Sequence, residues 1–459
     1  MNNYLEFDNI HIIGIGGISM SGIAKILINR GYKVSGSDIK KNSQIEILES
    51  MGAEIFIGHK ASNLRNAKAV VYTNAIDKHN VELKTAEKKE IKIYKRAQFL
   101  SELFKEKETI AITGTHGKTT TTSMLTSVFV NASLDPSVMI GGNLDLIGGN
   151  IKDGNGKYFI TEADESDGSF TFFDPKYAII TNIEWDHFDY YKSKEDLINK
   201  FIEFIDKIPD DGRLIIWGEA LKEYPQIKNH CENIVTYGLN NEDITAKNIT
   251  KIMFTTKFDL FINDKFIDKM IIKVPGEHNV LNALASFALS YTLKFSPKEI
   301  KNGLNRYNGV KRRFDKKGIY NNAVVIDDYA HHPTEIINTI KTAKDLKHNK
   351  LFVVFQPHRY SRTKNLMKEF SMSFDGVDEL ILTDIYSASE EPIPDINSNN
   401  LYKLVNQHKI NENINLNVHY IKKFKDIEKY LKNKLNPGDI LLTIGAGNVY
   451  EIGEKIVGE

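Results

Sequence analysis

The sequence of 459 residues has one cysteine, Cys231, and no excess of charge of either sign. One cysteine excludes an intrachain disulfide framework and a metal cluster built on thiolates, and it fits a reducing compartment. Lys plus Arg and Asp plus Glu each number 60, so there is no general electrostatic attraction to nucleic acid or anionic lipid. We therefore expect no nucleic-acid or membrane partner, and any phosphate chemistry must be local.

Long apolar runs are also missing. No stretch approaches the ~18 apolar residues of a transmembrane helix, and the first residues have neither the basic nor the apolar region of a signal peptide. A cytoplasmic protein is therefore expected. Apolar residues make up 41% and charged residues 26%, as in ordinary folded proteins. The length suffices for about three domains, each with its own core.

Alternating apolar strands and amphipathic helices predict an α/β fold in three domains. Residues 1–107 begin with a strand, a glycine-rich turn, a helix and a second strand, which is the βαβ unit of a Rossmann-like domain. Residues 108–310 predict a central α/β domain of the P-loop ATPase type, to which a hairpin around Asn263-Asp264 adds a small antiparallel piece. Residues 311–459 predict a C-terminal Rossmann-like α/β domain.

The first glycine-rich turn follows the first strand and reads Gly14-Ile-Gly16-Gly17-Ile18-Ser19. Taken alone, it favours a dinucleotide such as NAD or NADP, with Asp38 where an acidic residue contacts a ribose. The same physics, glycines at a helix N-terminus, serves another nucleotide's pyrophosphate equally well. A second and stronger nucleotide loop downstream argues against a dinucleotide-dependent oxidoreductase.

That second loop reads Gly114-Thr115-His116-Gly117-Lys118-Thr119-Thr120 and joins a strand to a threonine-rich helix. Its glycines let backbone N–H groups approach a phosphate chain, Lys118 would neutralise the β and γ oxygens, and the Thr119 hydroxyl suits Mg²⁺. Ile112 stands where the general P-loop pattern has its first glycine. The strand–loop–helix context nevertheless outweighs a plain surface turn.

Carboxylates follow the next two strands of the central domain. One cluster is Glu162-Ala-Asp-Glu-Ser-Asp, and the other is Asn182-Ile-Glu-Trp-Asp-His187. Either cluster alone is more often a solvated loop. Two of them behind strands that flank a phosphate loop predict a site for Mg²⁺, with Glu162 as a ligand and His187 able to hold a second metal or order its water shell.

These motifs, in this order and spacing, resemble the Mur ligases. The other segments that carry the resemblance are Pro275-Gly-Glu-His278-Asn279-Val-Leu-Asn282-Ala, Asp327-Asp328-Tyr329-Ala-His331-His332-Pro and Gln356-Pro-His358-Arg359-Tyr-Ser-Arg362. The resemblance covers the whole chain. It implies an ATP-dependent ligase that phosphorylates a carboxylate and couples it to an amine, with ATP and two Mg²⁺ ions bound.

The pattern is most similar to family members that join L-alanine to UDP-N-acetylmuramate during peptidoglycan synthesis, which serves cell shape and division. Those substrates are therefore expected, in a monomer or a weak homodimer. A sister ligase that adds a peptide or another amino acid to the same sugar is the nearest alternative.

The resemblance also implies roles for single residues. The first domain would bind the UDP-sugar through Gly14, Gly16, Gly17, Ile18, Ser19 and Asp38. ATP would contact residues Gly114, Thr115, His116, Gly117, Lys118, Thr119, Thr120, His278, Asn279, Asn282, Arg313 and Asp328. The metal ions would be held by Thr119, Glu162 and His187. Tyr329, His331, Arg359 and Arg362 would orient the carboxylates. Lys118, His187, Arg313 and His331 form the expected catalytic set. A bland alternative for His331 is a cap on the helix that begins near Pro333.

Overall fold

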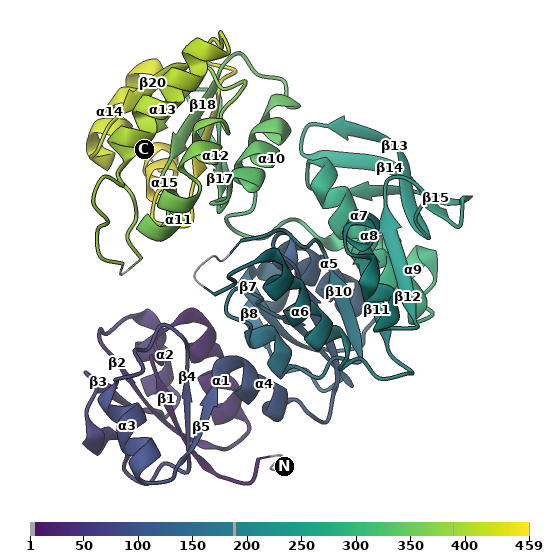
Figure 1. The fold of residues 1–459 in the computed structure, drawn as a ribbon, viewed down its shortest axis with the longest axis vertical. Helices are drawn as coiled ribbons and strands as arrows, with labels where there is room; N and C mark the ends of the chain where they lie inside the picture. Colours follow the sequence, from purple (N-terminus) through teal and green to yellow (C-terminus); the bar gives the residue numbers. More distant parts are fainter. Residues whose placement is uncertain (1–4, 187–189, 389, 459) are drawn as a thin grey trace. The chain divides into compact units, whose positions relative to one another are not determined.

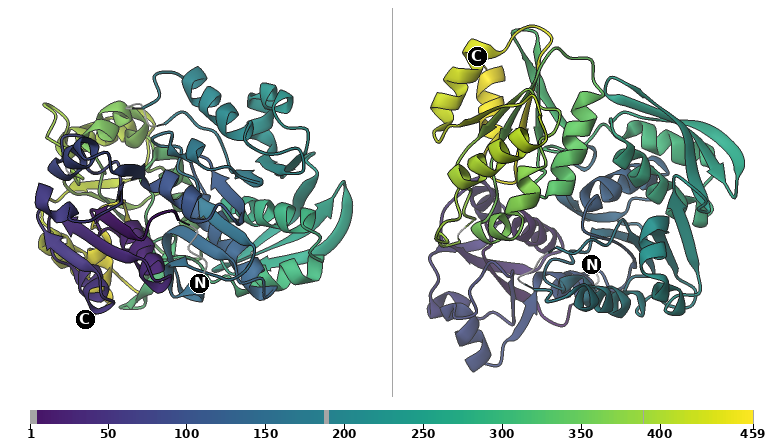
Figure 2. Two further views of the ribbon diagram at one scale, coloured as in Figure 1. Left: turned by 90° about the horizontal axis from the view of Figure 1, so that it is seen from below. Right: turned by 45° about the horizontal axis from the view of Figure 1, so that its top comes forward.

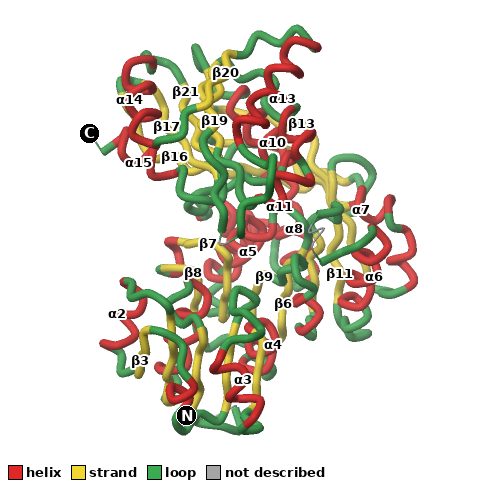
Figure 3. Tube along the Cα trace, turned by 60° about the vertical axis from the view of Figure 1, so that its left-hand side comes forward, coloured by secondary structure: helices red, strands yellow, loops and turns green. Residues whose placement is uncertain are grey.

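The computed structural model describes residues 5–186, 190–388 and 390–458 (Figure 1). The chain divides into two compact units. Unit 1 comprises Met1–Gly238, Glu242–Ile244 and Ala285–Gly303, and unit 2 comprises Leu239–Asn241, Thr245–Leu284 and Leu304–Glu459. In both units helices cover the faces of mainly parallel sheets (Figures 2 and 3), which confirms the predicted α/β class.

Unit 1 begins with a parallel sheet of five strands in the order β3-β2-β1-β4-β5. Its strands are β1 (Asn9–Ile13), β2 (Lys33–Asp38), β3 (Glu54–Ile57), β4 (Ala69–Tyr72) and β5 (Lys92–Lys95). Its helices are α1 (Ile18–Asn29), α2 (Ser43–Ser50), α3 (Val81–Lys88) and α4 (Arg96–Leu103). Because strand order reverses next to β1, the turn after this strand lies at a switch point, where open α/β sheets bind ligands.

The second sheet of unit 1 has the order β12-β11-β10-β6-β9-β7-β8. Its strands are β6 (Glu108–Thr113), β7 (Ser137–Leu144), β8 (Gly149–Lys152), β9 (Tyr158–Glu162), β10 (Tyr177–Ile180), β11 (Arg213–Trp217) and β12 (Ile234–Gly238). Its helices are α5 (Lys118–Asn131), α6 (Lys194–Ile205) and α7 (Gly218–Glu223). The central strand β6 pairs with β9 and β10, so the phosphate loop and both carboxylate clusters leave the same sheet edge.

Helix α5 is buried although it is rich in threonine and serine. Its hydroxyls bond to carbonyls one turn earlier: Ser123 Oγ donates to Thr119 O and Thr126 Oγ1 to Thr122 O, each at 2.7 Å. The helix backbone therefore satisfies polar groups that burial would otherwise leave unpaired.

Unit 2 contains an antiparallel piece made of β13 (Ile244–Ile252), β14 (Thr255–Ile262) and β15 (Lys265–Ile272). The predicted hairpin is confirmed: Asn263 and Asp264 join β14 to β15 with φ of 46° and 59°. Two positive φ angles match the twist of a tight hairpin, and asparagine and aspartate tolerate them. Helices α8 (Glu277–Thr292) and α9 (Pro297–Arg306) follow and contribute residues to both units.

The last sheet has the order β16-β17-β21-β18-β19-β20, and only β16 is antiparallel. Its strands are β16 (Asp315–Tyr320), β17 (Ala323–Asp328), β18 (Leu351–Phe355), β19 (Glu379–Leu382), β20 (Asn417–Tyr420) and β21 (Ile440–Ile444). Its helices are α10 (Pro333–Lys344), α11 (Tyr360–Asn365), α12 (Met367–Ser371), α13 (Ser398–Asn411), α14 (Phe424–Lys434) and α15 (Tyr450–Val457). Within the described part of the chain, no helix combines the length and apolarity needed to cross a bilayer.

Candidate nucleotide and substrate sites

The first glycine-rich loop lies between β1 and α1. Gly14 adopts φ of +76° and its N–H donates to Ser37 O at 2.8 Å. The Gly16 N–H donates to Asp38 Oδ2 at 2.9 Å, and Asn42 Nδ2 donates to Gly16 O at 3.0 Å. Gly17 caps α1 and has no side chain that could bond to the first N–H groups of the helix. The positive end of α1 is therefore available to an anion.

Two residues that are predicted to contact the ligand at this loop also have partners within the protein, which the sequence pattern does not predict. Asp38 holds the loop itself, through Gly16, besides any role toward a ribose. Arg96, the first residue of α4, donates from Nη1 to Ser19 Oγ at 3.4 Å. A guanidinium therefore lies beside the first turn of α1, where it adds positive charge to that of the helix dipole.

A buried carboxylate supports the loop from below. Glu82, in the first turn of α3, is fully buried and accepts from Ser37 Oγ at 2.5 Å and from Asn63 Nδ2 at 2.6 Å. His11 Nε2 and His59 Nδ1 lie 3.5 and 3.4 Å from its Oε2. Burial acts to raise the pKa of Glu82, but the hydrogen bonds from His11 and Ser37 outweigh it and lower the pKa to about 2. This charge therefore anchors Ser37, whose carbonyl holds Gly14.

The phosphate loop follows β6 and is tied down by the end of β10. A Cβ on Gly114, whose φ is +127°, would lie 2.2 Å from Thr181 Oγ1. Thr181 Oγ1 donates to His116 O at 2.6 Å, and Asn182 bonds to both the N–H and the carbonyl of His116 at 2.9 and 3.0 Å. Gly117, with φ of +83°, precedes α5 as its cap. The loop is thus held open around the N-terminus of α5.

Lys118 lies inside this loop rather than in solvent. Its Nζ donates to Gly114 O at 2.7 Å and to Glu165 Oε2 and Oε1 at 2.7 and 3.0 Å. Burial acts to lower the pKa of Lys118, but the negative charges of Glu165 and Asp164 outweigh it and raise the pKa. Lys118 therefore keeps its positive charge inside the loop. The side chain of Glu165 is 1% exposed. Glu165 belongs to the acidic cluster after β9, in which the sequence predicts a metal-binding role for Glu162 alone.

Thr119 and Glu162 meet at the start of α5. Thr119 Oγ1 donates to Glu162 Oε2 at 3.2 Å, and the Gly141 N–H of β7 donates to Glu162 Oε1 at 2.6 Å. A hydroxyl and a carboxylate side by side are the oxygen donors that Mg²⁺ prefers beside nucleotide phosphates. The pair therefore fits the predicted metal site, while His187 lies outside the described residues.

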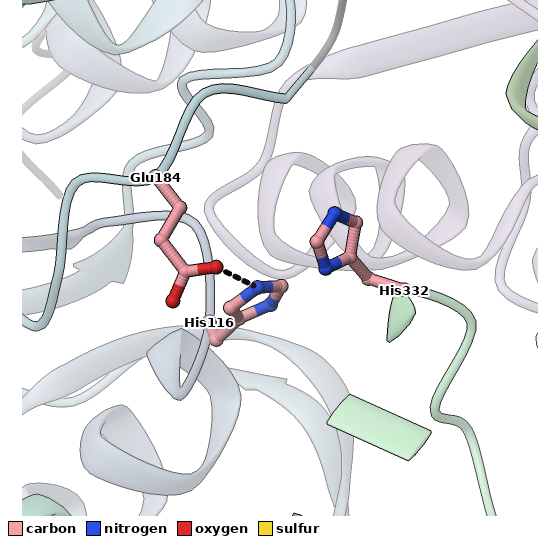
Figure 4. Close-up of side chains that lie close together, drawn as sticks. All are labelled: His116, Glu184 and His332. Carbon is pink, nitrogen blue, oxygen red and sulfur yellow. Dashed lines mark ion pairs between the residues drawn. The ribbon is translucent and has the colours of Figure 1, made fainter. Parts of the chain in front are cut away.

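Glu184 binds the other side of the phosphate loop. Its carboxylate lies 3.4 Å from His116 Nε2 (Figure 4), and its backbone N–H and carbonyl bond to Thr115 Oγ1 at 2.9 and 3.1 Å. His116 therefore has a carboxylate partner in the second acidic cluster, which the sequence analysis did not assign. The third side chain drawn in Figure 4, His332, belongs to unit 2.

In unit 2, three predicted ATP contacts share the start of α8. Asn279 Nδ2 donates to Pro275 O at 2.6 Å, and Asn282 Nδ2 donates to Asn279 Oδ1 at 3.2 Å. A Cβ on Gly276 would lie 2.5 Å from His278 Cε1. Burial lowers the pKa of His278 to about 4, so its imidazole is neutral at pH 7. The structure therefore brings His278, Asn279 and Asn282 together.

Asp328 ends β17 and is buried. Its Oδ2 accepts from Phe314 N at 2.7 Å and its Oδ1 from Ala330 N at 2.8 Å, while burial raises its pKa to about 6. Arg313 lies near this strand end, with its guanidinium carbon 5.1 Å from the centre of the Tyr329 ring. Asp328 thus shapes the backbone around Arg313 and Tyr329.

A histidine–arginine group follows β17 and β18. His331 Nδ1 lies 3.0 Å from Tyr329 O, and burial lowers the pKa of His331 to about 3. The ring centres of His331 and His358 are 6.1 Å apart, and Arg362 Nη1 lies 3.4 Å from His358 Nδ1. The Nε of Arg362 is buried and has no hydrogen-bond partner among the described residues. Arg362 therefore has a donor left for an anion.

Arg359, the other predicted carboxylate contact, precedes α11 as its N-cap residue. Its φ is +71°, its N–H donates to Tyr386 O at 2.9 Å, and its Nε lies 3.7 Å from Glu390 Oε1. A non-glycine residue in this region of φ is strained and persists only where its surroundings hold it, which is common at binding sites.

The capping alternative for His331 is wrong, because the cap is the next residue. His332 Nδ1 accepts from Thr334 N at 3.4 Å, and Glu335 bonds back to the His332 N–H at 3.4 Å. Pro333 takes the first helical position, where its missing N–H costs nothing. The His331 N–H also donates to Glu335, at 3.0 Å, but the His331 ring lies 3.0 Å from Tyr329 O and does not cap the helix.

Three family models match successive parts of the chain. The model described as the catalytic domain of the Mur ligase family matches residues 9–108, the Mur ligase middle domain matches 112–290, and the glutamate ligase domain of Mur ligases matches 312–447. The chain belongs to the Mur ligase family, which confirms the resemblance found in its sequence.

Three similar proteins show which members of the family this chain resembles. A UDP-N-acetylmuramate–L-alanine ligase of Clostridium acetobutylicum is 47% identical over 450 residues, which cover 98% of this chain and 97% of the relative. A solved structure of a UDP-N-acetylmuramate-alanine ligase from Thermotoga maritima is 31% identical, covers 98% of both chains and has a TM-score of 0.82. A murein peptide ligase from Psychrobacter arcticus is 25% identical, with 98% coverage of both chains and a TM-score of 0.71.

Proposed function

We propose that this chain is the ligase that joins L-alanine to the lactoyl carboxylate of UDP-N-acetylmuramate in peptidoglycan precursor synthesis, consuming ATP and releasing ADP and phosphate. The observation that carries the proposal is the full-length similarity to the alanine-adding relatives, at 47% identity for that of C. acetobutylicum. The peptide-adding relative from P. arcticus is less similar, at 25% identity.

The coupling needs an activated carboxylate, because a carboxylate does not react with an amine at neutral pH. The carboxylate oxygen would attack the γ-phosphorus of ATP and displace ADP, which gives an acyl phosphate. The amine of L-alanine would then add to the acyl carbon and expel phosphate, and its surplus proton would pass to a base or to solvent. No protein nucleophile is needed, so positioning and charge stabilisation must lower the barrier.

Lys118 is the residue best placed to stabilise the transferring phosphoryl group. It is held charged by Glu165 and tethered to Gly114 O at the N-terminus of α5. Its ammonium and the N–H groups of the loop are oriented before a phosphate arrives, and such preorganised donors stabilise developing charge without further rearrangement.

We further propose that Thr119 and Glu162 hold Mg²⁺, which would neutralise nucleotide phosphate charge when bound. Their oxygens are adjacent, and Gly141 fixes the orientation of the carboxylate. The second ion and the metal role of His187 stay predictions.

For the amino acid, we propose that Arg362 binds a carboxylate through its Nε, which has no hydrogen-bond partner among the described residues and lies near the neutral rings of His331 and His358. A guanidinium suits this task because it binds carboxylates with more than one N–H. The roles of Arg313, Asp328, Tyr329, Arg359, His278, Asn279 and Asn282, the three domain ranges, the cytoplasmic location and the monomeric or weakly dimeric state stay predictions.

The test is phosphate release from ATP and Mg²⁺ in the presence of UDP-N-acetylmuramate and a panel of amines. The panel contains L-alanine, glycine, L-serine and the tripeptide L-Ala-γ-D-Glu-meso-diaminopimelate. Release that requires both the sugar nucleotide and L-alanine supports the proposal. Release with the tripeptide alone would identify a peptide-adding ligase instead, and no release with any pair would refute both.

A further inference from the structure

An arginine at the end of α1 joins the first sheet of unit 1 to the edge of the second. Arg30 Nε and Nη2 donate to Asp153 Oδ2 and Oδ1, each at 2.7 Å, and Arg30 Nη1 donates to Leu103 O at 3.2 Å. The Arg30 and Asp153 side chains are only 16% and 24% exposed. A two-pronged, half-buried pair of this kind fixes orientation as well as distance.

The contact is reinforced on both sides. The guanidinium of Arg30 lies 4.9 Å from the centre of the Phe104 ring, which stacks on Phe159 of β9 at 4.1 Å. Ser137 Oγ of β7 donates to Asp153 Oδ1 at 3.3 Å. Asp153 therefore contacts a side chain of the second sheet as well as the arginine.

A second close approach lies nearer the start of α1. A Cβ on Gly22 would lie 2.8 Å from Ile151 Cγ2 of β8, so only glycine lets the helix pack this closely. We call Gly22, Arg30, Ile151 and Asp153 the α1–β8 seam. Helix α1 is 12 residues long, or about 18 Å, and two contacts along such a rod fix its direction.

The glycine-rich loop and the predicted metal ligand Glu162 are both connected to this seam. The N-terminus of α1 carries the glycine-rich loop. On the other side, β8 pairs with β7, β7 pairs with β9, and the Gly141 N–H of β7 binds the Glu162 carboxylate. The path from the sugar-nucleotide loop to the predicted metal ligand thus runs through one helix and two strands.

We propose that Arg30 is a positioning residue: through the α1–β8 seam it sets the distance between the glycine-rich loop and the phosphate loop, and hence between the substrate carboxylate and the γ-phosphate. The effect on catalysis rests on the proposed function. Arg30 touches neither substrate in this scheme. Its removal should change the position of the two sites relative to each other while each site stays intact.

The kinetic test compares Arg30→Ala, Arg30→Lys and Asp153→Asn with the parent. Because a misplacement of about 1 Å costs roughly 10²-fold in rate, kcat should fall by about that factor in Arg30→Ala. Arg30→Lys should lie between, since lysine keeps the charge but loses the fork. Calorimetric binding of UDP and of ADP, each read separately, should stay within about twofold. Arg65→Ala is the matched control, because Arg65 pairs with Glu54 within the first sheet's own domain.

The outcomes are distinct. A fall in kcat with both binding constants preserved supports the proposal, and so does recovery of activity in the charge-swapped Arg30→Asp, Asp153→Arg double variant. Unchanged kcat in Arg30→Ala, or a fall that merely follows lost binding or a lower melting temperature, would overturn it.

A distance measurement tests the positioning without any turnover. Spin labels are attached at Glu46→Cys on α2 and Lys194→Cys on α6, both exposed, in a Cys231→Ser background. Pulsed EPR should give one narrow distance distribution in the parent and in Arg65→Ala, and a broadened or shifted one in Arg30→Ala. An identical distribution in Arg30→Ala would overturn the positioning role even if the ligase activity is as proposed.

Discussion

Unit 1 contains two glycine-rich loops that use one backbone device with different side chains. Each follows a buried parallel strand, turns through a glycine of positive φ, Gly14 or Gly114, and leads into a helix capped by Gly17 or Gly117. The first loop is fastened by acceptors, namely Asp38 on Gly16 and the Ser37 carbonyl on Gly14. The second contains an ammonium, Lys118, together with a hydroxyl and carboxylates.

The difference separates binding from chemistry. Helix N-termini and bare glycines suffice to hold a pyrophosphate that does not react. Transfer of a phosphoryl group needs charge placed where negative charge shifts during the reaction, and only the second loop has Lys118 beside Thr119 and Glu162. The sugar-nucleotide loop is thus expected to affect KM, and the phosphate loop kcat.

Removal of the Lys118 ammonium should have the largest effect. Lys118→Ala should lower kcat by at least about 10³-fold, because a preorganised charge at the transferring group is lost. Lys25→Ala, in the helix of the first loop, is the matched control and should leave steady-state rates within about twofold. Circular dichroism and thermal melting check the fold. Near-parental turnover in folded Lys118→Ala would refute the assigned role.

A methyl group on each loop tests the backbone device itself. Gly114→Ala places a Cβ 2.2 Å from Thr181 Oγ1 at a φ of +127°, whereas Gly17→Ala meets only Gly14 O at 3.3 Å. We expect Gly114→Ala to lower kcat/KM for ATP by about 10²-fold, the size seen when an oriented donor is displaced. Gly17→Ala should change kcat/KM for the sugar nucleotide much less. Equal effects of the two substitutions would contradict the structure.

Removal of the acceptor in the first loop should act on binding alone. Asp38→Ala leaves the Gly16 N–H without its partner and should raise KM for UDP-N-acetylmuramate about tenfold, since a hydrogen bond to a charged group contributes about 1.5–3 kcal/mol. KM for ATP and kcat at saturation should change little. Steady-state kinetics with each substrate varied in turn measure both KM values and kcat. A selective loss of kcat would contradict the expectation that the first loop affects KM and the phosphate loop kcat.

The smallest expected effect is on stability in acid. The pKa of Glu82 is lowered from 4.5 to about 2 in the folded protein, so its charge stabilises the fold fully above pH 4.5, and this contribution is lost as the pH falls toward 2. Glu82→Gln should therefore lower the free energy of unfolding at pH 7, with a difference from the parent that shrinks between pH 4.5 and 2. Urea unfolding across this range measures it, and a constant difference would exclude the titration of Glu82 as the cause.

Much of the fold was predictable because apolar strands in parallel sheets are buried on both faces and stand out as short apolar runs. The strands Ala69–Tyr72, Leu351–Phe355 and Glu379–Leu382 are such runs. The β7–β8 pair was missed, because β8 is a short edge strand of intermediate burial whose polar residues resemble a loop. The two loops stand out in the sequence for a related reason, since clustered glycines between a strand and a helix are typical of nucleotide sites. The roles of their single residues stay predictions.

The α/β class, the family and the positions of both glycine-rich loops follow from the sequence, because they depend on local patterns of apolar, glycine and charged residues. The partners that those residues meet follow only from the tertiary structure. Glu165 pairs with Lys118 across 47 positions, Glu82 binds Ser37 of β2 across 45 positions, and Arg30 meets Asp153 across 123 positions. Nothing local specifies such pairs, because they depend on the order in which parallel strands assemble into a sheet.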